Sequence, residues 1–301
     1  MDQVSAPISL QTFNFEQMII VTGENSSIWR EIGSKYENDD VVYYDIINNK
    51  FRTNPLEVTE KLKAGNTVYI LHFASATPNN TSIDSHNYFY DKNYVNIKEL
   101  IFKVVECGVI KLKIVNISTS AIFDRTTPSS MLTLKSKKIS DGDAYGYSKL
   151  MLLNWFNEIA DEKIKVINII VPVLLGRYTG GNFLTRLIDA AHFKRIPNVS
   201  FIESKFNAMV SVRSLAWLID QYFEIPFQNT KTIINILGCS TGEIEIIKIL
   251  EILKLRRYEV ILNNFPPKRI STHSVLASFP RYSCDVLTEI RHYEKIRRIS
   301  C

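Results

Sequence analysis

The sequence predicts an α/β fold: a doubly wound parallel sheet of the Rossmann type, with a smaller lobe in the C-terminal part of the chain. Over most of the 301 residues, short apolar runs alternate with longer helical stretches, and such alternation implies a parallel sheet with helices on both faces. After about residue 172 the alternation becomes irregular, and Arg, Phe and Pro appear in loops. A smaller lobe inserted around the carboxyl ends of the strands would produce this change.

The expected strands are mostly continuous apolar runs, as strands covered on both faces should be. They span residues 17–22, 41–45, 67–73, 112–118, 165–171, 232–237 and 258–262. Helical stretches lie between them, near 27–36, 55–64, 93–107, 144–160, 182–193, 212–223 and 241–254. Ser240 and Glu243 open the last helix as a capping box, in which both side chains bind free amides of the first turn. We expect the segment 232–262 to return strands to the sheet.

Composition excludes several classes of function. The net charge of +5 comes from 36 basic and 31 acidic residues, and part of the excess lies in the tail, so we expect no nucleic-acid partner. The four cysteines are far apart, without CxxC spacing or nearby histidine pairs, which argues against a metal site and suits reduced thiols in a cytoplasmic protein. Residues 1–16 do not resemble a signal peptide, and no apolar run approaches the roughly 20 residues that a membrane span needs.

The end of the first predicted strand raises a question about ligand binding. The strand turns at Thr22 and Gly23, as a dinucleotide-binding loop does, yet no further glycine comes before Gly33. Asp45 ends the second strand, 22 residues beyond Gly23, which is close to the spacing of a carboxylate that binds the adenosine ribose and repels a 2′-phosphate. The alternative is an ordinary turn aspartate.

Two later strands also end in small or polar residues. His72, Phe73, Ala74 and Ser75 follow the third strand, where small side chains let a ligand approach the backbone. Hydroxyl groups cluster where the next strand ends, at residues 118–120. Ligands of a doubly wound sheet sit outside the carboxyl ends of its strands. The alternatives are a packed core histidine and hydroxyl groups that only form turns.

Tyr145 and Lys149 form the most informative pair. Residues four apart share one face of a helix, so the ammonium group can lie beside the phenol and stabilise phenolate. An isolated tyrosine has a pKa near 10, and proton transfer at neutral pH needs a lower value. A lysine together with a positively charged nicotinamide would lower the tyrosine pKa. A YxxxK match alone is common by chance.

Taken in this order, the motifs over roughly residues 17 to 240 resemble the extended short-chain dehydrogenase/reductase family, the NAD-dependent nucleotide-sugar epimerases, dehydratases and reductases. The resemblance also includes Asn96 as an asparagine that opens a helix, and the segments 171–176 and 209–219. It implies that Thr119 is the catalytic hydroxyl and that Tyr145 passes the proton. Lys149 would lower the tyrosine pKa and hold the nicotinamide ribose.

The resemblance further implies a division of the chain and a set of binding residues. Residues 1–172 would form mainly the dinucleotide-binding domain, and 173–301 mainly the substrate-binding lobe. A nucleotide sugar would be the substrate, no metal is implied, and helices near 93–107 and 144–160 would form a homodimer. The implied substrate contacts are Thr119, Ser120, Tyr145 and Asn182. The implied NAD contacts are Gly23, Ser26, Ser27, Ile28, Asp45, Ile46, Phe73, Ala74, Ser75, Tyr145, Lys149 and Pro172.

Several positions depart from the family pattern. The second and third glycines of its loop fall on Ser26 and Trp29. Ser26 can cap the helix or reach a phosphate, whereas the indole of Trp29 must push the helix outward or point away. The arginine that often precedes the segment 171–176 is Ile170, and the late aspartate is Ser214.

These departures leave several functions open. Dehydratases usually carry an Asp-Glu pair where this chain has Ser120 and Ala121, so we rank 4-ketoreductase or epimerase above dehydratase. The lost glycines suit a non-catalytic dinucleotide-sensing or scaffold protein on the same fold. Reduction of a non-sugar carbonyl is a third possibility.

Overall fold

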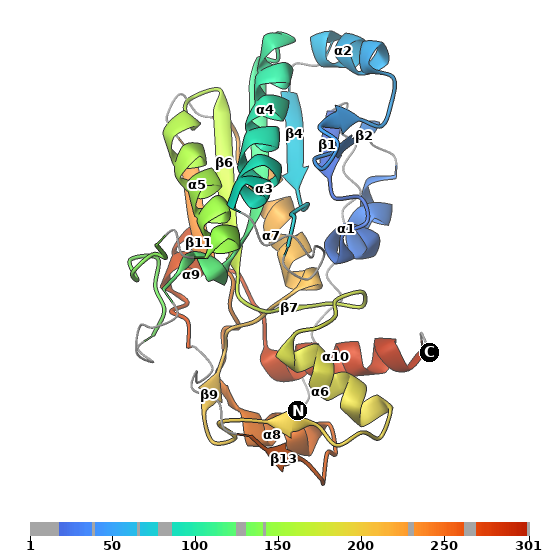
Figure 1. Ribbon diagram of the computed structural model, residues 1–301, viewed down its shortest axis with the longest axis vertical. Helices are drawn as coiled ribbons and strands as arrows, with labels where there is room; N and C mark the ends of the chain where they lie inside the picture. Colours follow the sequence, from blue (N-terminus) through green and yellow to red (C-terminus); the bar gives the residue numbers. More distant parts are fainter. Residues whose placement is uncertain are drawn as a thin grey trace.

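The computed structural model describes residues 18–37, 40–64, 67–77, 86–124, 131–140, 143–227, 232–261 and 269–299. Residues 1–16, Cys301 and the last residue of the predicted strand 258–262 lie outside these ranges. Within them, a large layered domain carries a smaller lobe beyond one end of its sheet (Figure 1). The doubly wound architecture predicted from the sequence is confirmed.

The central sheet has seven strands in the order β11-β6-β5-β4-β1-β2-β3. Six run parallel, and β3 pairs antiparallel with β2 as an edge strand. The chain reverses direction across the sheet at β1, which has β2 on one side and β4 on the other. The carboxyl ends of β1 and β4 therefore form the crevice where doubly wound sheets bind ligands. The strands are β1 (Met18–Thr22), β2 (Asp40–Asp45), β3 (Lys50–Phe51), β4 (Thr67–His72), β5 (Lys111–Thr119), β6 (Ile164–Val171) and β11 (Ile233–Leu237).

Helices cover both faces of this sheet. On one face lie α3 (His86–Tyr90), α4 (Asn96–Glu106) and α5 (Ala144–Ile159), in front of the strands in Figure 1. On the other lie α1 (Ser27–Ile32) and α7 (Val212–Glu224). Adjacent strand residues point to opposite faces, so Ile70 packs in the α4/α5 core and Leu71 in the α1/α7 core. Two buried faces explain why the strands are continuously apolar. The helix α2 (Pro55–Ala64) follows β3.

One polar layer interrupts the apolar core on the α4/α5 face. Its side chains come from in-register positions of five strands and from α5. Thr22 Oγ1 lies 2.7 Å from His72 Nδ1. Amide groups then hydrogen-bond head to tail, from Asn116 to Asn168 at 2.7 Å, from Asn168 to Asn235 at 2.8 Å and from Asn235 to Asn157 at 3.0 Å. The layer, which we call the polar row, consists of Thr22, His72, Asn116, Asn168, Asn235 and Asn157.

A buried lysine ties β5 to the end of α7. Lys113 is 3% exposed, and its Nζ donates to the carbonyls of Phe223 and Ile225, each at 2.6 Å. Carbonyls at a helix C-terminus carry partial negative charge and favour a cation. Burial lowers the pKa of Lys113 to about 8.

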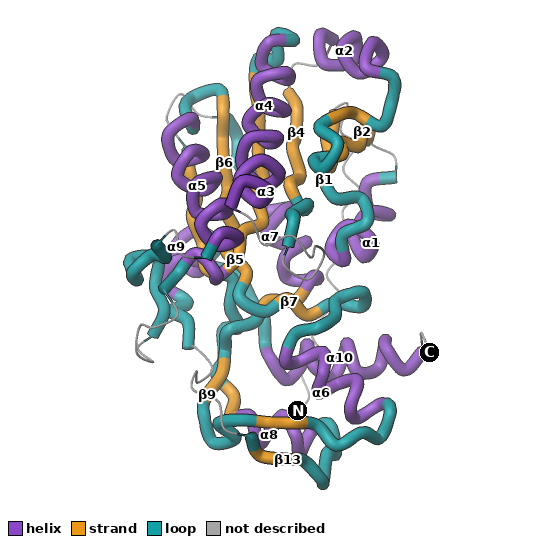
Figure 2. Tube along the Cα trace, viewed as in Figure 1, coloured by secondary structure: helices purple, strands orange, loops and turns teal. Residues whose placement is uncertain are grey.

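Short strands and helices build the smaller lobe (Figure 2). Three two-stranded pairs accompany it: β7 with β10, β9 with β12, and β8 with β13. Its helices are α6 (Phe183–His192), α8 (Ile246–Ile252) and α10 (Val286–Ile299), whereas α9 (His273–Ser278) lies beside β11 of the central sheet. The short strands are β7 (Leu174–Leu175), β8 (Asn198–Val199), β9 (Lys205–Phe206), β10 (Val210–Ser211), β12 (Ile244–Glu245) and β13 (Glu259–Val260).

Two expectations for this region are wrong. The strand predicted at 258–262 does not return to the central sheet, because its described part, β13, pairs with β8 in the lobe; β11 alone of the two predicted strands joins the sheet. The capping box does not form either, since α8 begins at Ile246. The Ser240 hydroxyl instead donates to the Cys284 carbonyl at 2.7 Å, and Glu243 pairs with Arg269.

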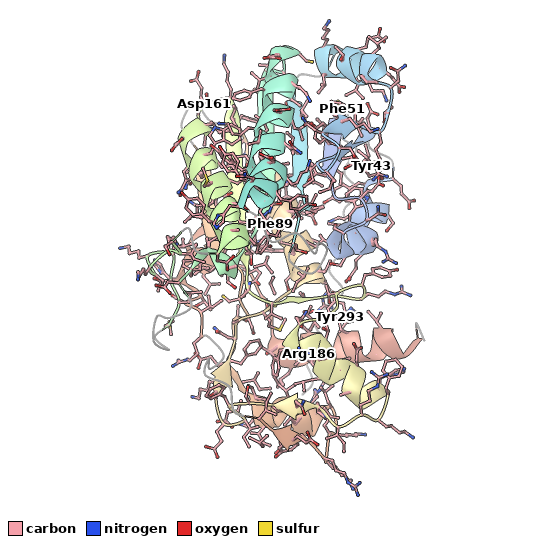
Figure 3. The ribbon with its side chains drawn as sticks, viewed as in Figure 1. Tyr43, Phe51, Phe89, Asp161, Arg186 and Tyr293 are labelled. Atoms are coloured by element: carbon pink, nitrogen blue, oxygen red, sulfur yellow. The ribbon has the colours of Figure 1, made fainter. Side chains whose placement is uncertain are left out.

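Glu31 of α1 links the sheet domain to the lobe. One carboxylate oxygen accepts the Tyr293 hydroxyl of α10 at 2.6 Å, and the other accepts the Arg177 amide at 2.7 Å. Figure 3 shows Tyr293 at the level where the two parts meet. A Cβ on Gly176 would lie 2.7 Å from the same carboxylate, so glycine is needed for this close approach.

Across the described ranges, no helix is both long and apolar enough to cross a membrane. Those ranges also contain no group of acidic, histidine and cysteine side chains arranged to hold a metal ion. The cytoplasmic location stays a prediction.

Candidate active site

Three hydroxyl groups meet beyond the carboxyl ends of β4 and β5. Tyr145 lies in the first turn of α5, and the side chains of Ser75 and Thr119 are the polar groups that act on its phenol. Burial raises the pKa of Tyr145, and the Ser75 and Thr119 hydroxyls oppose this shift without cancelling it. The phenol is therefore protonated at neutral pH in the chain without cofactor.

Local sequence around Tyr145 explains how α5 reaches this position. Asp143 caps the helix, its carboxylate accepting the Gly146 amide at 2.9 Å. Gly146 packs against the carbonyl of Ala121, and a Cβ there would lie 2.4 Å from that oxygen. No larger residue fits without a shift of α5 away from the segment after β5. Gly146 thus sets the distance between Tyr145 and Thr119.

Lys149 lies one turn further along α5 and is 1% exposed. Its Nζ has no hydrogen-bond partner among the residues that the structure describes, and the same holds for Nε2 of His72. Burial lowers the pKa of Lys149 to about 8. Burial and then the charge of Lys149 lower the pKa of His72 well below its usual value. The expected lowering of the Tyr145 pKa by Lys149 is not present in the chain without cofactor, where burial dominates.

The buried ammonium group of Lys149 indicates whether the site fits a dinucleotide. A buried donor without a partner is costly, and ribose hydroxyls are acceptors that would satisfy Lys149. At the carboxyl ends of β1 and β4, Gly23 has φ +84° and packs closely against the Ala74 backbone, because a Cβ on it would lie 2.7 Å from the Ala74 amide nitrogen. The residues fit a bound dinucleotide.

Asn93 fixes the segment that carries Ser75. It lies in a π-helical turn (Asp91–Val95) between α3 and α4. Its side-chain oxygen accepts the Ala76 amide at 2.8 Å, and its amide donates to the Ala76 carbonyl at 3.0 Å and the Ser148 hydroxyl at 3.1 Å. Such turns often occur at functional sites. Asn96 is the first residue of α4, as expected, although a helical stretch already begins at His86, and its side chain donates to the Ile46 carbonyl.

At the start of α1, the two replaced glycines have different roles. Ser26 is the N-cap, and its hydroxyl accepts the Trp29 amide at 3.1 Å. Trp29 does not point away from the fold, as one alternative required; it is 7% exposed. Its indole stacks on Tyr36 at 5.7 Å between ring centroids and contacts Tyr43 and Phe73. Aromatic packing of Trp29 has replaced the close contact between helix and strand that a glycine allows at this position.

Asp45 is bound within its own turn. Its Oδ1 accepts the amides of Ile47 and Asn48 at 3.0 and 3.1 Å, and its Oδ2 accepts the Asn48 side chain at 2.8 Å. Arg52 lies 3.7 Å from the same carboxylate. Burial raises the pKa of Asp45, but the hydrogen bonds and the charge of Arg52 outweigh burial and hold the pKa below its usual value.

The remaining predicted residues are dispersed. Ile28 and Ile46 are 4% and 3% exposed and pack in the core, and Ser27 begins α1. Asn182 caps α6, accepting the Thr185 amide at 3.0 Å and donating to the Leu174 carbonyl at 2.8 Å.

A pocket of about 320 Å³ opens next to Ser120. Pro172 lines it from the sheet domain, and Phe183, Arg186 and Phe206 line it from the lobe. Asn182 is absent from its lining. Figure 3 places Arg186 in the lobe, on α6. The pocket therefore combines hydroxyl, aromatic and cationic groups beside Thr119.

The family model described as the NAD dependent epimerase/dehydratase family matches residues 27–202, more than half of the chain. The chain belongs to the NAD-dependent epimerase/dehydratase family. It is accordingly an NAD-dependent enzyme of the epimerase or reductase kind. No curated protein matches the chain by sequence.

Solved structures show the fold of this family member. A dTDP-4-dehydrorhamnose reductase from Clostridium acetobutylicum matches 93% of this chain and 99% of its own, with 18% identity and a TM-score of 0.65. UDP-glucose 4-epimerase from Thermus thermophilus, complexed with NAD, matches 94% and 100%, with 13% identity and a TM-score of 0.69. RMD from Pseudomonas aeruginosa, complexed with NADPH, matches 95% and 100%, with 13% identity and a TM-score of 0.67.

Proposed function

We propose that the chain transfers a hydride between a nicotinamide dinucleotide and a nucleotide-activated sugar, as a 4-ketoreductase or an epimerase. The observation that carries the proposal is the buried ammonium group of Lys149, which has no partner among the described residues, one helical turn from Tyr145, whose phenol is close to the Ser75 and Thr119 hydroxyls. Ser120 and Ala121 stand where a dehydratase usually carries acidic residues, which favours the other two reactions.

The residues have complementary roles in the proposed reaction. Thr119 orients the sugar oxygen, and Tyr145 donates a proton to that oxygen during reduction or removes it during oxidation. Lys149 binds the nicotinamide ribose, and its ammonium charge then lowers the tyrosine pKa. When bound, the nicotinamide supplies or accepts the hydride. The raised pKa of Tyr145 keeps it protonated before cofactor binds, which suits reduction.

The pocket beside Ser120 is the proposed substrate site. Arg186 lines it, and a guanidinium group binds a diphosphate with paired hydrogen bonds. Phe183 and Phe206 lie 5.9 Å apart between ring centroids and offer apolar surface. A larger pocket of about 520 Å³ lies between α8 and α10. We assign the substrate to the smaller pocket because Ser120, which directly follows Thr119, lines it, whereas no residue of the segment 118–120 lines the larger one.

A homodimer through α4 and α5 is also proposed. The α4 face exposes Phe102 and Val105, which are 50% and 43% exposed, and Phe102 lies 6.0 Å from Trp155 of α5. Sedimentation of the wild type and Phe102→Glu distinguishes a dimer from a monomer. A monomeric wild type would contradict this proposal.

The proposed reaction is tested with a Tyr145→Phe variant. Mass spectrometry of small molecules released from the purified protein first identifies the retained dinucleotide and nucleotide. Turnover is then measured with 4-keto sugars linked to that nucleotide. We expect Tyr145→Phe to lower turnover about 100-fold or more, the lower end for loss of a positioned acid.

Tyr147→Phe is the matched control, because it removes the same atom from the same helix. Its turnover should stay close to wild type. Normal turnover in Tyr145→Phe would overturn the assignment. Dinucleotide binding without conversion of any nucleotide sugar would favour the sensing protein instead.

A further inference from the structure

Arg52 joins two parts of the crevice that are distant in sequence. It follows β3, at the edge of the sheet where Figure 3 labels Phe51 and Tyr43, and its amide donates to the Tyr43 carbonyl at 3.0 Å. This pairing turns Arg52 toward the β1–α1 turn. Its guanidinium forms an ion pair with Glu24 and lies 3.7 Å from Asp45.

The charges around Arg52 alter the expected choice of cofactor. The Asp45 carboxylate is expected to repel a 2′-phosphate, but Arg52 places a cation beside it. Three hydrogen bonds from its own turn already occupy the Asp45 carboxylate. Its capacity to bind ribose hydroxyls and repel a phosphate is correspondingly reduced.

Glu24 directly follows Gly23 in the turn that would face the pyrophosphate, so its charge opposes phosphate binding. Arg52 neutralises that charge in the chain without cofactor. The Arg52 side chain is 48% exposed and Glu24 23% exposed, and exposed ion pairs of this kind are weak. A phosphate dianion, which accepts paired hydrogen bonds from guanidinium, is a stronger partner than one carboxylate.

We propose that Arg52 lets the chain accept NADPH in addition to NADH: its guanidinium exchanges Glu24 for the 2′-phosphate of NADPH, so that both dinucleotides bind. This inference rests on the proposed dinucleotide site. It adds a residue from the edge strand to a crevice formed by β1 and β4. It also gives Glu24 a function, because the carboxylate holds Arg52 beside the site until the phosphate binds.

Three variants test the exchange, with dissociation constants for NADPH and NADH measured by calorimetric titration. Arg52→Gln should weaken NADPH about tenfold or more, the effect of losing a hydrogen bond to a charged group, and leave NADH within about threefold. Glu24→Gln should tighten NADPH by removing the competing carboxylate. Lys50→Gln removes a positive charge two residues away, and it should leave the NADPH to NADH ratio within about twofold.

The outcomes separate this inference from the function on which it rests. Titration of 2′,5′-ADP against 5′-AMP isolates the 2′-phosphate, and the wild type should bind 2′,5′-ADP more tightly, with a difference that shrinks in Arg52→Gln. If both dinucleotides bind and Arg52→Gln leaves the ratio of their dissociation constants unchanged, Arg52 does not bind the 2′-phosphate. If the wild type binds neither dinucleotide, the proposed function fails as well. Arg52→Lys, which retains the charge, should keep part of the preference and guards against misfolding of Arg52→Gln.

Discussion

Two ends of the same crevice differ in how their polar groups are satisfied. At the β1–β2–β3 end, Ser26 caps a helix, Asp45 binds its own turn, and Arg52 pairs with Glu24. At the β5–α5 end, by contrast, the buried Nζ of Lys149 has no partner among the described residues. The first end is complete without a ligand, whereas the second needs one. The two replaced glycines of the family loop, Ser26 and Trp29, lie at the end whose groups satisfy one another.

The largest expected effect comes from Trp29. Trp29→Ala removes a buried indole and should lower the free energy of unfolding by roughly 3–5 kcal/mol. Dinucleotide affinity should also fall, because Phe73 and Tyr43 lose the ring that they contact. Trp155→Ala is the control, since Trp155 is equally buried, at 7% exposed, but lies between α4 and α5. Urea unfolding and NADH titration give both quantities, and equal losses of affinity in the two variants would contradict a specific role for Trp29.

Lys149 offers a test of the other end. A lowering of its pKa from 10.5 to about 8 corresponds to a penalty of about 3 kcal/mol on the charged form. The unfolded chain binds the proton more tightly, so this contribution makes stability rise as the pH increases from about 8 to 10.5. We therefore expect Lys149→Met to stabilise the chain without cofactor below pH 8 by up to about 3 kcal/mol, and to lose this advantage toward pH 10.5.

Lys113 provides the contrasting variant. Its pKa is also lowered to about 8, yet two carbonyls accept its hydrogen bonds. Lys113→Met should therefore destabilise the chain by roughly 1–3 kcal/mol, because buried acceptors lose their donor. Urea unfolding at several pH values compares the two variants. Destabilisation by Lys149→Met at pH 7 would mean that its ammonium group is satisfied in the fold.

A smaller effect is expected at Ser26. Ser26→Ala removes the N-cap of α1 and should cost about 1 kcal/mol of stability. Ser27→Ala, one residue inside the helix, should cost less than half as much. Thermal unfolding distinguishes them. If Ser26→Ala changes the free energy of dinucleotide binding more than the free energy of unfolding, the Ser26 hydroxyl binds phosphate rather than capping the helix.

The sequence predicted the central sheet well because burial on both faces leaves a clear apolar signal, as in the run Ile19 to Val21. It failed at β13, whose pattern does not specify which strand it joins. The family resemblance indicated Thr119 and Tyr145, and the YxxxK spacing alone indicated only Tyr145 and Lys149. Spacing could not reveal Arg52, which reaches Asp45 through an antiparallel edge strand. The close packing at Gly146 could have been predicted from the sequence, since this glycine lies between the two tyrosines of the motif.

Asn93 shows a different limit of sequence reasoning. An asparagine was expected near the start of a helix, and Asn96 matched that description. The π-helical turn shifts the side chains by one residue relative to a regular helix, and Asn93 is the one that holds the Ser75 segment. Helical periodicity alone indicates Asn96, which opens α4, and does not reveal the role of Asn93.

The polar row also has an electrical direction. Each asparagine amide donates toward the next, from Asn116 to Asn157, so the dipoles add rather than cancel. The row leaves the buried Asn116 oxygen as its unpaired negative end, beside His72 in the strand register. After burial, the charge of Lys149 is the second cause that lowers the pKa of His72. An aligned series of neutral amides thus ends in partial negative charge beside His72, and this contribution does not titrate with pH.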